Sequence, residues 1–157
     1  MIHTRGKIFA ALLAVFLVLV SCSKRPADEE LIRAAVASAV KSAELKDVSA
    51  FMKKVSRSYR DDYGNDYGAI KAILFSRLFV SEKNRFFVSG VSVEVKGDMA
   101  VADVKVVMVF GKEPATIKEV LPEDAAAMRF GIVLARKDGD WKAVSASWER
   151  IGLAGLI

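Results

Sequence analysis

The chain has one thiol and one imidazole, and both lie near its start, at Cys22 and His3. The stretch from Ser23 to Ile157 holds neither. Nucleophilic catalysis of the Ser-His-Asp or Cys-His type needs an imidazole base, and zinc sites are built largely from His and Cys. A domain formed from that stretch therefore cannot be a hydrolase of either type. We assign it no catalytic residue, no metal and no cofactor.

The densest polar cluster is the run from Tyr59 to Asp66, which contains Asp61, Asp62, Asn65 and Asp66. Oxygen ligands crowded into a short loop are typical of calcium sites, but the spacing does not match D-x-[DN]-x-[DN]-G and lacks the bidentate glutamate. A structural role is favoured, in which Asn65 or Asp66 caps a helix and the other acids form salt bridges. Contact of Asp61, Asp62 and Asp66 with a ligand or partner is the alternative.

Three further carboxylates, Glu94, Asp103 and Glu149, fall in segments with the two-residue alternation of strands. A carboxylate that points into an apolar site beside a tyrosine has a raised pKa and can act as a proton-abstracting base. In the register read from the alternation, Asp103 faces away from the covered side of the sheet. This placement weakens the proton-transfer hypothesis.

Aromatic and arginine side chains are the remaining candidates for a binding site. Core packing is the favoured role of the aromatic set, and lining of a pocket is the alternative. Arg129 and Arg150 lie on the late strands, where exposure is favoured over contact with an anionic ligand. The candidate pocket residues are Tyr59, Tyr63, Tyr67, Phe79, Met108, Phe110, Phe130 and Trp148.

The first residues form a leader: Met1 to Lys7 carry two cations and no anion, and thirteen apolar residues follow from Ile8 to Val20. This layout is typical of a secretory signal and is too short for a permanent membrane span. Its end, with Leu19 and Ser21 before Cys22, resembles the lipobox of bacterial lipoproteins. The resemblance implies cleavage before Cys22, acyl chains on that residue and, because Ser23 replaces the aspartate typical of inner-membrane retention, an outer-membrane location facing the periplasm.

The predicted organisation is a signal peptide over residues 1–21, a lipidated tether over 22–27 and one domain over 28–157. Without the leader's Arg5 and Lys7 the chain has a net charge of about +3, since the whole sequence has 24 basic and 19 acidic side chains. So mild a charge, scattered among acids, gives no indication of nucleic-acid binding. Because the lipid would consume the only thiol, the domain is expected to fold without a disulfide.

Helical spacing dominates the first half of the domain. One helix is expected over about 28–45, and a second is expected from a cap at Asp47 to about Gly64. A third is expected to begin at Asn65 or Asp66 and to end before Ser81. Its single apolar stripe would comprise Ile70, Ile73, Leu74, Leu78 and Phe79.

From Phe86 onward the apolar period changes to two, which predicts four antiparallel strands. Hairpin turns are expected at residues 96–98 and 137–140, and the second strand should run over 99–110 with its even-numbered residues covered. The third and fourth strands are expected over about 127–136 and 141–151, after a long connection with one helical turn near 117–120. The fold class is therefore α+β, with helices packed against one face of the sheet.

Two local patterns support a more specific comparison. The run Gly139 to Val144 with the later Trp148 resembles the C-terminal hairpin of the nuclear transport factor 2-like superfamily, and Tyr59 to Asp66 resembles a junction in its bacterial members of unassigned function. The resemblance covers about residues 28–151. It implies a strongly curved antiparallel sheet of about four strands wrapped over helices into a cystatin-like cone. Fold alone settles no function in this superfamily.

The leading functional hypothesis is a lipid-anchored envelope protein with a non-catalytic domain that binds a small apolar molecule or a partner protein. One alternative is an isomerase or dehydratase that uses a pocket carboxylate and a tyrosine. Another is a domain that dimerises through the exposed sheet face, where Ser145 and Ser147 lie beside valines.

Overall fold

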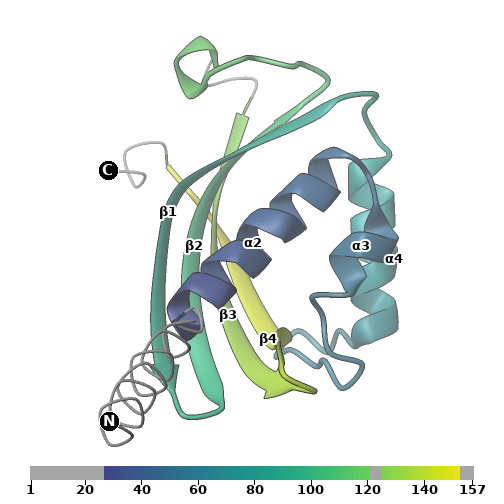
Figure 1. Ribbon diagram of the computed structural model, residues 1–157. Coiled ribbons are helices and arrows are strands. Elements are labelled where there is room, and N and C mark those ends of the chain that lie inside the picture. The colour runs from purple at the N-terminus through teal and green to yellow at the C-terminus, as the bar shows by residue number, and fades with distance from the viewer. Residues whose placement is uncertain (1–26, 121–124, 153–157) are drawn as a thin grey trace, which may run out of the picture.

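The computed structural model describes residues 27–120 and 125–152, in which helices pack on one face of a four-stranded sheet (Figure 1). The helices are α2 (Asp28–Glu44), α3 (Val48–Met52) and α4 (Tyr67–Leu78), and the strands are β1 (Asn84–Lys96), β2 (Met99–Phe110), β3 (Ala125–Lys137) and β4 (Asp140–Ile151). A short 3-10 turn, η1 (Ile117–Glu119), lies between β2 and β3. The strands pair in the order β1-β2-β3-β4, all antiparallel, so the predicted α+β class is confirmed.

The predictions for residues 1–21 and for lipidation of Cys22 lie outside the described residues. Within the described ranges, no helix has the length and apolar character needed to cross a bilayer.

The core lies between the sheet and α2. Ala102, Val104 and Val106 of β2 are buried on the helix-facing side, where Ile32 and Val36, one turn apart on α2, join the same apolar cluster. The alternation predicted for β2 is confirmed from Ala100 to Val106, because burial of one face leaves only one register that hides these side chains. It is wrong at the end of the strand, where Val107 and Val109 are buried and Phe110 is exposed.

The beginning of α2 is attached to both hairpin turns. The Asp28 carboxylate accepts hydrogen bonds from Arg136 Nη2 at 2.6 Å and from Trp141 Nε1 at 3.2 Å. Arg136 Nε also donates to Asp98 Oδ1, in the turn between β1 and β2, at 3.1 Å. The hydrogen bond from Arg136 holds the pKa of Asp28 below its usual value. Asp28, the first residue of α2, is therefore tied to the sheet.

The predicted second helix is wrong in length, because α3 ends at Met52 rather than near Gly64. After α3 the chain runs along the free edge of β4. Ala143 N donates to Lys54 O, and Ser56 N donates to Ala143 O, both at 2.8 Å. Backbone groups that a helix would have paired internally are satisfied by a strand far away in the sequence.

The same segment continues to cover the edge of β4. Arg60 N donates to Val144 O at 3.0 Å, and the Tyr63 hydroxyl donates to Trp148 O at 3.4 Å. Exposed strand edges are templates for pairing with other chains. The covered edge of β4 is therefore removed from such pairing between Ala143 and Trp148.

At the opposite edge of the sheet, backbone groups of β1 form hydrogen bonds with side chains of α2. Phe86 N donates to Glu44 Oε1 at 3.0 Å, and Arg33 donates to Val91 O. These two contacts cap β1 at points where no neighbouring strand is present.

Candidate functional site

The acidic cluster predicted from the sequence is organised around one buried carboxylate. Asp61 is only 6% exposed. Its oxygens accept hydrogen bonds from Tyr63 N at 3.0 Å, from Asn65 N at 2.9 Å and from the Tyr59 hydroxyl at 3.1 Å. The Asn65 side-chain amide donates to both oxygens, at 3.1 and 3.2 Å.

Burial of the Asp61 carboxylate raises its pKa, but hydrogen bonds from Asn65, Tyr59 and Tyr63 outweigh that effect and hold the pKa below its ordinary value. The pKa of Tyr59 is raised, first by burial and then by the charge of Asp61. With every donor coming from its own loop, Asp61 is a structural hub rather than a group that faces a ligand.

The other acids of the cluster do not join Asp61 in one site. Asp66 caps α4, because its Oδ1 accepts from Ala69 N at 2.9 Å, as the capping hypothesis predicted. Asp62 is exposed. Arg150 is also exposed, opposite Met128 in the strand register. The structure therefore does not bring Asp62, Asp66 and Arg150 together.

The candidate aromatic residues are divided among different environments. Tyr59 lies in the core at 4% exposure, and Tyr67, Met108 and Phe130 are half-buried against the core. The other four lie nearer solvent: Phe110 makes an edge contact with Phe86, Trp148 lies against Tyr63 at a centroid distance of 4.9 Å, and Phe79 stacks on Phe75. They do not converge on one cavity lined by the whole set.

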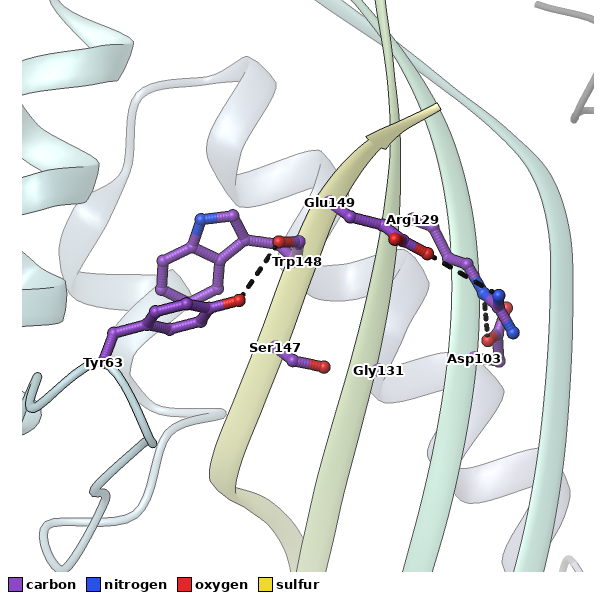
Figure 2. A pocket seen from close by; sticks show the side chains of 7 residues that line it. All are labelled: Tyr63, Asp103, Arg129, Gly131, Ser147, Trp148 and Glu149. Carbon is purple, nitrogen blue, oxygen red and sulfur yellow. Dashed lines mark hydrogen bonds and ion pairs between the residues drawn. The ribbon is translucent and has the colours of Figure 1, made fainter. Parts of the chain in front are cut away.

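A shallow depression of about 330 Å³ lies instead on the sheet face opposite the helices. Asp103, Gly131 and Ser147 form a row across β2, β3 and β4, as the strand register requires. A Cβ at Gly131 would lie 3.0 Å from Ser147 Oγ, so the missing side chain leaves the floor open. Figure 2 shows the lining residues, which are Tyr63, Asp103, Arg129, Gly131, Ser147, Trp148 and Glu149.

The charges of this depression are paired with one another. Arg129 Nε lies 2.6 Å from Asp103 Oδ2, and its Nη1 lies 3.7 Å from Glu149 Oε1. The hydrogen bond to Asp103 raises the pKa of Arg129. Two carboxylates paired with a half-exposed guanidinium on the outer sheet face lack the apolar surroundings that produce a general base.

The third strand carboxylate is placed similarly. Glu94 lies between Val93 and Val95, which pack toward the core, and its side chain is exposed and paired with Lys96 Nζ at 2.8 Å. All three strand carboxylates thus face away from the helices, as predicted for Asp103.

Sequence analysis missed a surface on α4. The predicted single stripe is wrong for Ile73 and Phe79, because only Leu78 of α4 is buried and both of those residues are exposed. Phe75 and Phe79 are 58% and 50% exposed and stack with ring centroids 4.6 Å apart.

The exposed apolar surface continues past the end of α4. Lys46 Nζ lies 5.5 Å from the Phe79 ring centroid and donates to Ser81 O, which brings their neighbours Leu45 and Val80 to the same end of the helix. Leu45 is 66% exposed and Val80 is 79% exposed. We call the set Leu45, Phe75, Phe79 and Val80 the α4 band. Ile73 is exposed on a different side of α4, about 160° around the helix from Phe75. The sequence signal for it is a helix with apolar residues on both faces.

Among the described residues there is no cluster of three or more His, Cys, Asp or Glu side chains that could hold a metal ion.

No protein-family model matches this sequence, and no curated protein matches it significantly. Solved structures do. A protein of unknown function with a cystatin-like fold from Nostoc punctiforme is 12% identical, with a TM-score of 0.65 over 85% of this chain and 98% of the other. A Pseudomonas putida protein of unknown function, described as nuclear transport factor 2-like, is 16% identical, with a TM-score of 0.65 over 80% and 87%. The chain has the nuclear transport factor 2-like, or cystatin-like, fold.

A further match is a Streptomyces avermitilis protein provisionally described as a dehydratase of the nuclear transport factor 2-like family. It is 15% identical, with a TM-score of 0.64 over 79% of this chain and 96% of the other. At these identities the nuclear transport factor 2-like fold is shared, while the activities of its members differ.

Proposed function

We propose that this chain is a lipid-anchored protein of the cell envelope whose nuclear transport factor 2-like domain is a non-catalytic module that binds a partner protein. The observation that carries the proposal is the α4 band. One face of α4 packs against the core, through side chains that include Ile70, Leu74 and Leu78. Phe75 and Phe79 lie on another face and are left exposed, although a helix that is apolar on both faces belongs in an interior. Contiguous exposed apolar surface of this kind marks an interaction site.

The composition of the α4 band favours a protein partner over a small molecule. Two stacked phenylalanines on a convex helix surface offer no enclosed volume, whereas small-molecule sites are concave. Aromatic side chains are enriched at the centre of protein interfaces. The α4 band therefore supports binding of a small apolar molecule less well than binding of a protein.

The anchor and the band would lie at opposite ends of α2. The helix begins at Asp28, six positions after Cys22, and its 17 residues span about 25 Å at 1.5 Å per residue. The α4 band adjoins the other end of α2, beyond Glu44 (Figure 1). A lipid on Cys22 would thus leave the band directed away from the outer membrane and into the periplasm.

The dehydratase description of the Streptomyces protein makes proton transfer the natural competing function. An isomerase or dehydratase of this kind needs a carboxylate that points into an apolar pocket. Here Asp103 and Glu149 lie on the outer face of the sheet and share Arg129. The geometry therefore supports binding over proton transfer.

Dimerisation through the outer sheet face has an observation of its own. Met99 and Val101 of β2 are 46% and 51% exposed there, and the small side chains Ser145 and Ser147 of β4 lie on the same face, one strand further across the sheet. A second copy could pack flat against such a surface.

One experiment separates these functions. A photo-crosslinking amino acid replaces either Phe75 or Val101 in the full-length protein, and the cells are irradiated before the envelope is analysed by mass. We expect the Phe75 position to give a discrete adduct with a different protein and the Val101 position to give none. An adduct of twice the chain's mass at Val101 alone would support dimerisation instead, and no adduct at Phe75 would contradict the proposal.

A further inference from the structure

The depression on the outer sheet face combines an aromatic wall with polar side chains that line the same space. Tyr63 and Trp148 lie on one side of it, Arg129 and Asp103 lie on the other, and Ser147 lies between them (Figure 2). Its volume of about 330 Å³ falls at the lower end of the range for small-molecule sites. The α4 band contains none of these residues, so the depression is a second candidate site.

The aromatic wall is held in place by the buried loop around Asp61. Tyr63 N donates to Asp61 Oδ1 at 3.0 Å, and the Tyr63 hydroxyl donates to Trp148 O at 3.4 Å. The ring centroids of Tyr63 and Trp148 lie 4.9 Å apart. Tyr63 is nevertheless 59% exposed, so much of its ring is open to a ligand. Contacts that fix an exposed ring in advance reduce the conformational entropy that is lost when a ligand packs against it.

The polar groups of the depression retain capacity for further hydrogen bonds. Glu149 Oε1 lies 3.7 Å from Arg129 Nη1, which is too long for a hydrogen bond. Within the described part of the chain, the side chains of Ser147 and Glu149 form no hydrogen bond. Asp103 accepts from Arg129 Nε through Oδ2 at 2.6 Å, which leaves its Oδ1 for a ligand.

The floor of the depression is open because the middle residue of its row is a glycine. Gly131 lies between Asp103 of β2 and Ser147 of β4 in the strand register. Its φ is not positive, so the backbone conformation does not require glycine there. Glycine weakens the interior of a strand, and it often marks a place where a ligand approaches the backbone closely. Gly131 therefore fits the floor of a binding site.

We propose that this depression binds a sugar unit of a neutral saccharide. A pyranose ring has an apolar C–H face, which packs well on an aromatic ring, and a rim of hydroxyl groups that both donate and accept hydrogen bonds. Tyr63 offers the aromatic surface, while Ser147 and Glu149 offer the hydrogen-bonding groups. The saccharide would be a second ligand, beside the proposed partner protein of the α4 band.

The charges of the depression favour a neutral ligand over other classes. Asp103 and Glu149 supply two negative charges, and Arg129 supplies one positive charge. An anion would meet an excess of carboxylates, and a cation would compete with Arg129 for the same oxygens. A purely apolar molecule would bury the polar groups of Ser147 and Glu149 without hydrogen bonds. Sugar hydroxyls can donate to the carboxylates without displacing Arg129.

The test measures binding by saturation-transfer NMR on the full-length protein in an oligo(oxyethylene) detergent, which has no sugar headgroup. Saturating the aromatic protons of the protein leaves the detergent signals untouched. The ligands are cellotriose, triacetylchitotriose and, as the anionic comparison, trigalacturonate. We expect a neutral trisaccharide to bind with a Kd of about 1 mM or lower, and trigalacturonate to bind at least about tenfold more weakly. Absence of saturable binding by both neutral sugars up to about 20 mM would overturn the proposal.

Single substitutions identify the site. Tyr63→Ala should weaken the neutral sugar by about tenfold or more, and Phe75→Ala, which removes a ring of similar exposure on α4, should not. Glu149→Ala should also weaken it, whereas Glu94→Ala changes a carboxylate of similar exposure on the same sheet face and should have no effect. Gly131→Val fills the floor without removing a contact group and should abolish binding. Circular dichroism and thermal unfolding verify that each variant is folded.

The remaining outcomes are equally decisive. Sugar binding that is unchanged in Tyr63→Ala and Gly131→Val would place the sugar elsewhere and overturn the site. Trigalacturonate binding as tightly as the neutral sugars would overturn the choice of ligand class. Self-association that Gly131→Val abolishes, with no sugar binding, would overturn the proposal in favour of a second copy. The crosslink at Phe75 is independent of these measurements, so the proposed function is tested separately.

Discussion

At the scale of single residues, Asp61 has the largest predicted effect on stability. Replacement by Ala leaves the Tyr63 and Asn65 amides and the Tyr59 hydroxyl without their acceptor in a buried loop. Unfolding in urea should show a loss of about 2 to 3 kcal/mol. The neighbouring exposed Asp62→Ala is the control and should stay within about 0.5 kcal/mol of the parent. Equal effects of the two substitutions would contradict the structural role assigned to Asp61.

The same carboxylate predicts a pH dependence. The folded-state pKa of Asp61 lies below its ordinary value of about 3.9, so its contribution to stability is present above about pH 4 and is lost as pH falls through the folded-state pKa. The difference in unfolding free energy between the parent and Asp61→Asn should therefore shrink between pH 4 and pH 2. Asp28, Glu94 and Glu113 also have lowered pKa values, but both proteins contain them and their effects cancel. A difference that stays constant over this range would contradict the assignment.

At the scale of elements, α4 depends on its cap because so little of it is buried. Asp66→Ala removes the acceptor for Ala69 N and should cost about 1 kcal/mol of unfolding free energy. Asp66→Asn keeps an acceptor and should restore most of the loss. Hydrogen exchange of the α4 amides is the measurement, since it reports this helix separately from the core. Unchanged exchange in the Ala variant would show that packing alone holds α4.

The strand register could be predicted from the sequence, and the second helix could not. Residues 99–106 alternate between buried and more open positions, and a shift of one residue would place Ala100, Ala102, Val104 and Val106 on the outer face. Val48, Phe51, Met52, Val55 and Tyr59 fit helical spacing equally well. The chain nevertheless leaves the helix after Met52, because the backbone groups of Lys54 and Ser56 form hydrogen bonds with Ala143. Local periodicity cannot show such a long-range contact.

The candidate site was partly predictable for the same reasons. The capping role of Asp66 and the outward direction of Asp103 follow from local pattern and were confirmed. The α4 band did not follow, because apolar residues on both faces of a helix do not indicate which face the fold covers. The sequence places Leu78 and Phe79 in one stripe, whereas the structure buries Leu78 and leaves Phe79 exposed.

At the scale of the whole molecule, the proposed anchor makes a testable prediction. Cys22→Ala should abolish lipid attachment, so the protein should lose the mass of the acyl chains and leave the membrane fraction. Ser23→Ala, one residue further on, keeps the thiol and should remain membrane-bound. Mass spectrometry of protein from fractionated cells measures both. An unmodified Cys22 in the parent protein would contradict the lipoprotein hypothesis and, with it, the outward orientation of the α4 band.

The proposed lipid anchor would crowd copies of this protein on a membrane surface, where the covered edge of β4 matters. Neighbouring copies held at one height would present their strands to one another repeatedly, and an open ladder would let one copy template the next into a growing fibre. Here residues 54–63 occupy the positions a foreign strand would need between Ala143 and Trp148. Local concentration can therefore rise without seeding polymerisation from this side of the sheet.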